Sequence, residues 1–247
     1  MHCEYINYSS DDTECRGFLA YNDKIHDKKP CILVAHAWNG QNELTRTKAK
    51  QLAELGYVGF AVDLYGNGKE AKDDKESAQL MQPLFQNRKL LQNRIKSGFR
   101  CAASLPMVDS MKIGGIGFCF GGLAIIELLR SGANVKGVAS FHAVLGNEGA
   151  ETVPIAKGIQ GSLLILHGYD DPLVSTDDIL RTQKELNDAK VDWQMNIYGH
   201  TSHGFTNPEL NDPKSGLVFN PKSSERSWMA MTLFFDEIFA RKSASSK

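Results

Sequence analysis

Strand-like and helix-like segments alternate along most of the chain. Short and nearly continuous apolar runs are typical of strands buried on both faces, and they predict such strands at residues 31–36 and 57–64. Further strands are predicted at residues 112–118, 137–142, 163–167 and 193–198. Apolar residues at helical spacing predict helices at residues 43–55, 87–105, 120–130, 176–189 and 227–239. This alternation predicts an α/β fold in which a mainly parallel sheet of about seven or eight strands carries helices on both faces.

The remaining segments complete the expected architecture. The first part of the chain is expected to add two antiparallel strands, at 4–8 and 18–21. Stretches rich in charge, Gly, Pro or Asn predict loops at residues 69–86, 146–161 and 201–224, and the start of a helix is the alternative for residues 69–77. Residues 69–86 and 206–224 are expected to form walls of a pocket. Residues 243–247 are expected to be a polar tail. No repeat, linker or low-complexity segment divides the sequence, so residues 1–247 are expected to form one domain.

The composition gives no sign of a highly charged partner. Of the 247 residues, 42% are hydrophobic and 23% are charged, which is close to the globular average. Lys and Arg total 28 against 29 Asp and Glu, so neither nucleic acid nor an anionic membrane surface is expected as a partner. No apolar run reaches the length of about 18 residues that a membrane span needs. The N-terminal residues lack the apolar core of a signal peptide, and a cytoplasmic location is expected.

One of the five cysteines lies in a nucleophile-elbow pattern. Residues 117–121 read Gly-Phe-Cys-Phe-Gly, and this G-x-C-x-G joins a predicted strand to a predicted helix. Glycines in such a turn avoid clashes around a strained nucleophile, so Cys119 is a candidate nucleophile. The alternative is a small buried cysteine where a helix packs on the sheet. The other four are scattered and without C-x-x-C spacing, so they are expected to be reduced thiols: Cys3, Cys15, Cys31 and Cys101.

Candidate acids and bases follow two later strands. Asp170 and Asp171 come after the predicted strand at 163–167, and His200 and His203 come after the predicted strand at 193–198. Ligands of open α/β sheets bind beyond the carboxyl ends of the strands, and the chain order nucleophile, acid, histidine suits such a sheet. A helix N-cap is the alternative for the acidic pair, and a solvated loop or a metal site is the alternative for the histidines. Because the sequence specifies no ligand set, neither a metal nor another cofactor is predicted.

Three motifs stand in order along the chain: GFCFGG at 117–122, HGYDDPLV at 167–174 and YGHTSHGF at 198–205. Together they resemble the dienelactone hydrolase (carboxymethylenebutenolidase-like) family. The resemblance extends from the strand at 31–36 to the final helix. It implies an α/β-hydrolase fold and a Cys-Asp-His catalytic triad.

The resemblance places this triad on Cys119, Asp171 and His203. Asp171 matches the acid better than Asp170 because it directly precedes the proline of its motif. His203 matches the base better than His200 because of its spacing from the preceding strand and the following Gly-Phe. The segment VDLYG at 62–66 also resembles the family and is expected to be structural.

Two positions depart from the best-known enzymes of that family. Ala37 stands where those enzymes carry a glutamate that contacts the resting thiol. The segment Thr206-Asn207-Pro208 stands where they carry an arginine that holds a substrate carboxylate. The resemblance therefore implies an ester or lactone bond without naming the substrate, and the near-neutral composition fits a small or weakly charged one.

These residues imply hydrolysis of a small-molecule ester or lactone through a thioester on Cys119. His203 would take the thiol proton or hold an existing thiolate–imidazolium pair, and Asp171 would orient the ring. The N-terminus of the helix that follows Cys119 favours a thiolate. The backbone N–H groups of Phe120 and Trp38 are expected to form the oxyanion hole. Two other interpretations stay open: a non-catalytic α/β-hydrolase scaffold that binds a ligand or a protein, and the same triad acting on thioesters or peptides.

Overall fold

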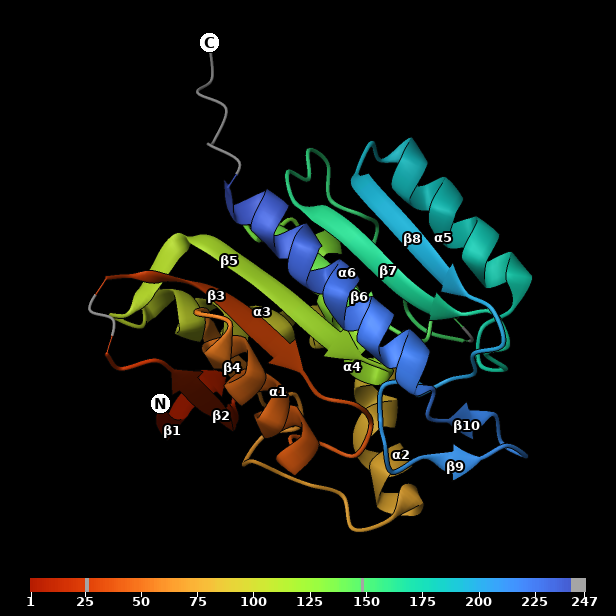
Figure 1. Cartoon of the computed structure of the whole chain (residues 1–247), viewed down its shortest axis with the longest axis horizontal. Coiled ribbons are helices and arrows are strands. Elements are labelled where there is room, and N and C mark those ends of the chain that lie inside the picture. Colours follow the sequence, from red (N-terminus) through yellow and green to blue (C-terminus); the bar gives the residue numbers. More distant parts are fainter. Residues whose placement is uncertain (25–26, 148, 241–247) are drawn as a thin grey trace.

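The computed structural model describes residues 1–24, 27–147 and 149–240; the tail predicted at 243–247 lies outside them. Eight strands form one sheet in the order β1-β2-β4-β3-β5-β6-β7-β8 (Figure 1). Their bounds are β1 (His2–Ser10), β2 (Thr13–Tyr21), β3 (Lys29–Ala35), β4 (Val58–Val62), β5 (Val108–Phe118), β6 (Gly137–Phe141), β7 (Ser162–Gly168) and β8 (Asp192–Tyr198). β1 pairs antiparallel with β2 and β2 pairs antiparallel with β4, whereas the other neighbours are parallel. The predicted α/β fold with a mainly parallel sheet is confirmed.

Helices cover both faces of the sheet. They are α1 (Glu43–Glu54), α2 (Asp74–Gln86), α3 (Arg88–Ser104), α4 (Phe120–Arg130), α5 (Thr176–Asp188) and α6 (Pro221–Ala240). One apolar cluster lies between the sheet and α3, α4 and α5, and a second lies between the sheet and α1 and α6. Helices α1 and α6 lie on the face of the sheet turned to the viewer in Figure 1. In β3, the neighbours Ile32 and Leu33 are both fully buried but belong to opposite clusters. Alternate side chains of a strand point to opposite faces, which explains the continuous apolar runs.

The first predicted loop is wrong over most of its length because α2 occupies Asp74–Gln86. The side chain of Asp73 caps this helix by accepting a hydrogen bond from the Glu76 N–H at 2.8 Å. Acidic residues in the first turn favour a helix N-terminus, but in the sequence they give a charged run that is also typical of a surface loop. Only a narrow face, including Leu84, is buried, so the apolar period is weak.

The last predicted loop is also wrong in part. It contains a short hairpin, β9 (Asn211–Asp212) and β10 (Leu217–Val218), and α6 begins at Pro221 rather than at residue 227. Proline suits the first turn of a helix because its missing N–H would have had no acceptor there. The side chain of Asn220 caps the same turn by accepting a backbone hydrogen bond at 3.1 Å.

The parallel strands bring the candidate residues to one edge of the sheet. β3, β5, β7 and β8 run in the same direction, so the segments that follow their carboxyl ends share that edge. These segments carry Trp38, Cys119, Asp171 and His203. Among the helices of the described residues, none combines the length and the hydropathy of a membrane span.

Candidate active site

Cys119 occupies a strained turn between β5 and α4. Its backbone has φ 54° and ψ −115°, which is rare for a residue with a side chain. The Cys119 N–H donates to the Phe141 carbonyl at 3.0 Å, which ties the turn to the neighbouring strand β6. Such strain persists only where the surroundings hold it, and it is common where a reactive side chain must be presented.

The two glycines of the G-x-C-x-G motif allow this turn to close. A Cβ on Gly117 would lie 2.0 Å from the Gly121 carbonyl oxygen. A Cβ on Gly121 would lie 2.1 Å from the Ala35 carbonyl oxygen, because α4 begins directly against the end of β3. Both distances are far below van der Waals contact, so larger residues would displace the turn that carries Cys119.

Asp171 and His203 meet although they lie 32 residues apart. His203 Nδ1 lies 2.8 Å from Asp171 Oδ2, and both residues are buried. Asp171 Oδ1 accepts a hydrogen bond from the Leu173 N–H at 2.9 Å, so the carboxylate is oriented by its own turn. With Nδ1 engaged by the carboxylate, Nε2 is the ring nitrogen left for chemistry.

The hairpin β9–β10 braces the segments that carry Asp171 and His203. The His203 N–H donates to the Gly216 carbonyl at 3.0 Å, and the Val218 N–H donates to the His203 carbonyl at 3.2 Å. Gly216 has φ 67°, and a Cβ there would lie 2.4 Å from Pro172 Cγ. The hairpin therefore fixes the histidine backbone and packs against the turn of the acid at the same time.

The charges around His203 favour its protonated form. Burial lowers the pKa of His203, but the negative charge of Cys119 and the hydrogen bond and charge of Asp171 outweigh burial and raise this pKa to about 10. His203 Nε2 is buried and has no hydrogen-bond partner of standard geometry among the described residues. The arrangement can therefore hold a thiolate–imidazolium pair, the activated form of a cysteine nucleophile.

The other four cysteines have different surroundings. All five thiols are free. Burial raises the pKa of Cys15 and Cys101 to about 11 and raises the pKa of Cys31 still further. Cys3 is exposed. The three thiols with raised pKa values are held protonated at neutral pH and are poor nucleophiles.

The two residues predicted for the oxyanion hole flank the Cys119 turn. Phe120 is the first residue of α4, where backbone N–H groups have no acceptor within the helix. Trp38 lies in the segment that follows β3, and the last residue of β3, Ala35, pairs with Gly117 of β5. The Trp38 carbonyl accepts a hydrogen bond from the Tyr65 hydroxyl at 2.6 Å.

Two buried histidines that the motifs do not single out surround the Asp171–His203 pair. The ring of His142 lies 5.1 Å from the ring of His203, and its Nε2 lies 2.8 Å from Thr206 Oγ1. His167 Nδ1 lies 4.0 Å from Asp171 Oδ2. Burial lowers the pKa of both rings, so they stay neutral beside His203. In the sequence, the feature that points to these two histidines is their position at the carboxyl ends of β6 and β7. Asp171 and His203 likewise follow the carboxyl ends of strands.

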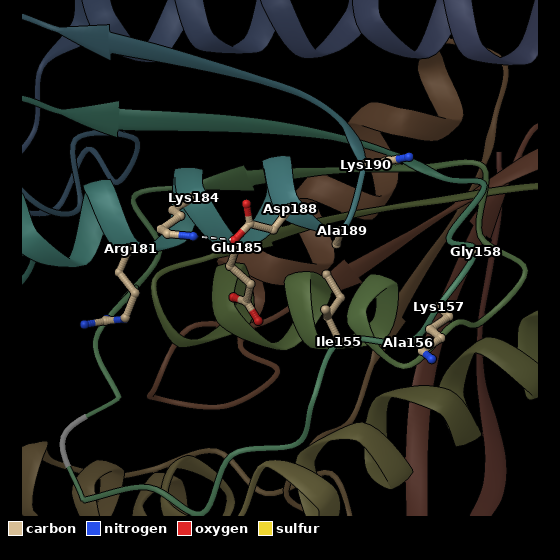
Figure 2. A pocket seen from close by; sticks show the side chains of 10 residues that line it. All are labelled: Ile155, Ala156, Lys157, Gly158, Arg181, Lys184, Glu185, Asp188, Ala189 and Lys190. Atoms are coloured by element: carbon tan, nitrogen blue, oxygen red, sulfur yellow. Dashed lines mark hydrogen bonds and ion pairs between the residues drawn. The ribbon is translucent and has the colours of Figure 1, made fainter.

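A surface pocket of about 580 Å³ lies elsewhere, between residues 155–158 and the carboxyl end of α5 (Figure 2). Residues 155–158 lead into β7 and α5 leads into β8, so this pocket lies near the amino ends of those strands, away from Cys119. Its Lys184 is paired with Asp188 at 2.5 Å. Within the ranges that the structure describes, no group of three or more His, Cys, Asp or Glu side chains is arranged to hold a metal ion.

Known proteins resemble this chain in sequence and in fold. A crystal structure of a dienelactone hydrolase-like promiscuous phosphotriesterase from metagenomic libraries superposes with a TM-score of 0.90, at 30% identity, and covers 96% of this chain and 98% of that chain. A Synechocystis protein provisionally named carboxymethylenebutenolidase is 27% identical over 221 residues, which are 81% of this chain and 85% of that protein. A Bradyrhizobium protein provisionally named 2-oxo-3-(5-oxofuran-2-ylidene)propanoate lactonase is 21% identical over 187 residues, 73% of this chain and 75% of that protein.

The match to a family profile covers nearly the whole chain. The profile of the Dienelactone hydrolase family matches residues 15–239, which extend from β2 to the end of α6. The stretch includes the Cys119 turn and the segments of Asp171 and His203. The chain belongs to the dienelactone hydrolase family and is a dienelactone hydrolase-like hydrolase with the α/β-hydrolase fold.

Proposed function

We propose that this hydrolase cleaves small ester or lactone bonds through a thioester on Cys119, with His203 as base and acid and Asp171 as the residue that orients His203. The 2.8 Å contact between His203 Nδ1 and Asp171 Oδ2 carries the proposal, because it leaves the buried Nε2 to interact with Cys119. Cys119 is the charged group with the largest effect in raising the pKa of that ring. Nucleophile, base and orienting acid are thus connected in the order that acyl transfer requires.

The first half-reaction forms the thioester. The Cys119 thiolate attacks the carbonyl carbon, an S–C bond forms, and the carbonyl electrons move onto oxygen. When the oxyanion collapses, the bond to the leaving alcohol breaks and the His203 imidazolium donates its proton to the departing oxygen. In a lactone the alcohol stays attached to the acyl group, so the same step opens the ring.

The second half-reaction releases the acid. Neutral His203 takes a proton from water while the water oxygen attacks the thioester carbonyl. The C–S bond then breaks, and Cys119 leaves as a thiolate beside the newly formed imidazolium. The resting pair is thereby restored, with Asp171 stabilising the charged ring in both half-reactions.

The backbone N–H groups of Phe120 and Trp38 stabilise the oxyanion in this proposal. The Phe120 N–H lies in the first turn of α4, where its orientation and the helix dipole both favour negative charge. Loss of one such donor typically costs about 3 kcal/mol in the transition state.

Uncharged or weakly charged esters and lactones are the substrate class that the site supports. Thr206, at the place where the best-known family enzymes bind a carboxylate, uses its hydroxyl to contact His142. The similar proteins are named for a butenolide, a lactone and phosphotriesters. Of the electrophiles in these compounds, the carbonyl carbon of an ester or lactone is the one best suited to attack by a thiolate and to stabilisation by two N–H donors.

A substrate panel tests the proposal. Neutral short-chain aryl esters, small neutral lactones, matched carboxylate-bearing esters and one neutral phosphotriester are assayed with the wild-type protein. We expect turnover of the neutral esters or lactones, with lower kcat/KM for their carboxylate-bearing counterparts. Absence of turnover of every acyl substrate would contradict the proposed function and favour a ligand-binding scaffold.

A further inference from the structure

Tyr65 contacts both residues that are proposed to form the oxyanion hole. Its hydroxyl donates to the Trp38 carbonyl at 2.6 Å, and its ring stacks on that of Phe120 with centroids 6.1 Å apart and planes 19° apart. The side chain is 9% exposed. Burial and the nearby charge of Cys119 raise the pKa of Tyr65, so the hydroxyl keeps the proton that it donates.

The turn that carries Tyr65 is held by a buried carboxylate. Asp63 is fully buried and accepts four backbone hydrogen bonds, at 2.7–3.0 Å, from the N–H groups of Arg16, Tyr65, Gly66 and Gly68. Gly66 and Gly68 have positive φ, 91° and 63°, which glycine adopts without strain. These hydrogen bonds fix the backbone of the VDLYG segment and therefore the position from which the Tyr65 side chain extends.

His36 makes a second connection between the segments after β3 and β4. Its Nε2 accepts a hydrogen bond from the Leu64 N–H at 3.1 Å, which assigns the ring proton to Nδ1. Nδ1 lies 2.7 Å from the Ala37 carbonyl oxygen and donates to it. The His36 and Tyr65 rings are in edge contact, with centroids 4.7 Å apart. Burial lowers the pKa of His36, which keeps the ring in this neutral form.

Hydrogen bonds to the Ala37 and Trp38 carbonyls fix both peptide planes that flank Trp38. The Ala37 carbonyl accepts from His36 and also from the Gly40 N–H at 3.2 Å, and the Trp38 carbonyl accepts from Tyr65. The Ala37–Trp38 peptide is trans, so the Trp38 N–H points opposite to the Ala37 carbonyl that His36 holds. Tyr65 holds the carbonyl of the next peptide, between Trp38 and Asn39. With both planes fixed, the direction of the Trp38 N–H is set before any substrate binds. An oxyanion donor that needs no reorganisation is worth more in the transition state than a mobile one.

We infer that Tyr65 and His36 are positioning residues that aim the Trp38 N–H at the oxyanion. This inference rests on the proposed acyl-transfer function and adds to it the hydrogen bonds that orient the Trp38 N–H, the second donor of the oxyanion hole. Ala37, at the position of the family's glutamate, takes part in these hydrogen bonds through its backbone carbonyl alone. Tyr65 acts through Trp38 and not on the thiol, which separates its effect from that of His203.

Two reactions of Cys119 distinguish this role from a general structural one. Ester hydrolysis passes through an oxyanion, whereas alkylation by iodoacetamide forms an S–C bond and expels iodide at a saturated carbon without any oxyanion. Tyr65→Phe should therefore lower kcat for a neutral aryl ester by about tenfold, within the range set by losing a whole donor, with KM nearly unchanged. The rate of Cys119 alkylation should equal that of the wild type.

Tyr57→Phe is the matched control, because the Tyr57 hydroxyl bonds to Asp236 at 3.1 Å, near α6 and away from the site. It should leave kcat unchanged, and both variants should show similar small shifts in Tm.

His36→Phe removes the side-chain hydrogen bond to the Ala37 carbonyl and should have the same pair of effects, a lower kcat and an unchanged rate of alkylation. Wild-type kcat in Tyr65→Phe would overturn the inference alone. Equal losses of hydrolysis and alkylation would also overturn it, because Tyr65 would then act on the thiolate. No turnover by the wild type would overturn the proposed function, and this inference with it.

Discussion

Cys119→Ala is expected to lower kcat for ester hydrolysis by about 10⁵-fold, since removal of the nucleophile of a triad typically leaves only the small residual rate that binding and the oxyanion hole supply. Cys119 is half-buried at a strained turn, and alanine removes one sulfur without filling space. The fold should therefore persist, with Tm near that of the wild type. Initial rates with a neutral aryl ester, at saturating substrate, measure the effect.

Cys3→Ala is the matched control because Cys3 is exposed and lies on the edge strand β1. It removes a thiol of the same chain without touching the site, and wild-type kcat is expected. Substantial turnover by Cys119→Ala, in a protein free of wild-type contamination, would show that another residue is the nucleophile.

His203→Ala should cause the second large loss, about 10⁴-fold or more in kcat, because it removes the proton donor for the leaving group and the base for water together. The same variant should change how the alkylation of Cys119 depends on pH. The pKa of His203 is raised from 6.5 to about 10, so the imidazolium is present below pH 10 and supports the thiolate across that window. Below pH 10, alkylation of Cys119 should therefore be faster in the wild type than in His203→Ala, and this difference should shrink as the pH rises through that value.

His200→Ala is the matched control for this experiment. His200 lies on the same segment but is exposed, and its removal should leave both the rate and the pH profile unchanged. If His200→Ala and His203→Ala had similar effects, the histidine assigned as the base would be wrong.

The parts of the fold and site that follow from local sequence are the parts that could be predicted. The Gly-Phe-Cys-Phe-Gly pattern lies within five positions, and Gly117 is needed there because its own turn folds back against the Gly121 carbonyl. Asp171 follows the buried strand β7 and His203 follows the more exposed edge strand β8, and parallel strands bring such positions to one edge without further information. Their 2.8 Å contact is a consequence of that topology.

The supports of the site could not be predicted, because they depend on contacts between distant segments. The hairpin β9–β10 has two residues in each strand, too few to show an alternating pattern. The bond from Tyr65 to Trp38 joins positions 27 residues apart, and its acceptor is a backbone carbonyl. His36 acts in the same way through the Ala37 carbonyl. A carbonyl acceptor places no constraint on residue type, so such contacts leave no motif in the sequence.

The thioester on Cys119 is the central claim, and mass spectrometry of the trapped acyl-enzyme tests it most directly. Wild-type protein is mixed with a neutral aryl ester, quenched in acid before the first turnover is complete, and digested for peptide mapping. The account predicts a single acyl group on the peptide that contains Cys119, released by hydroxylamine at neutral pH as a thioester is. An acyl group on a serine or lysine, or rapid turnover with Cys119 unmodified at every quench time, would contradict it.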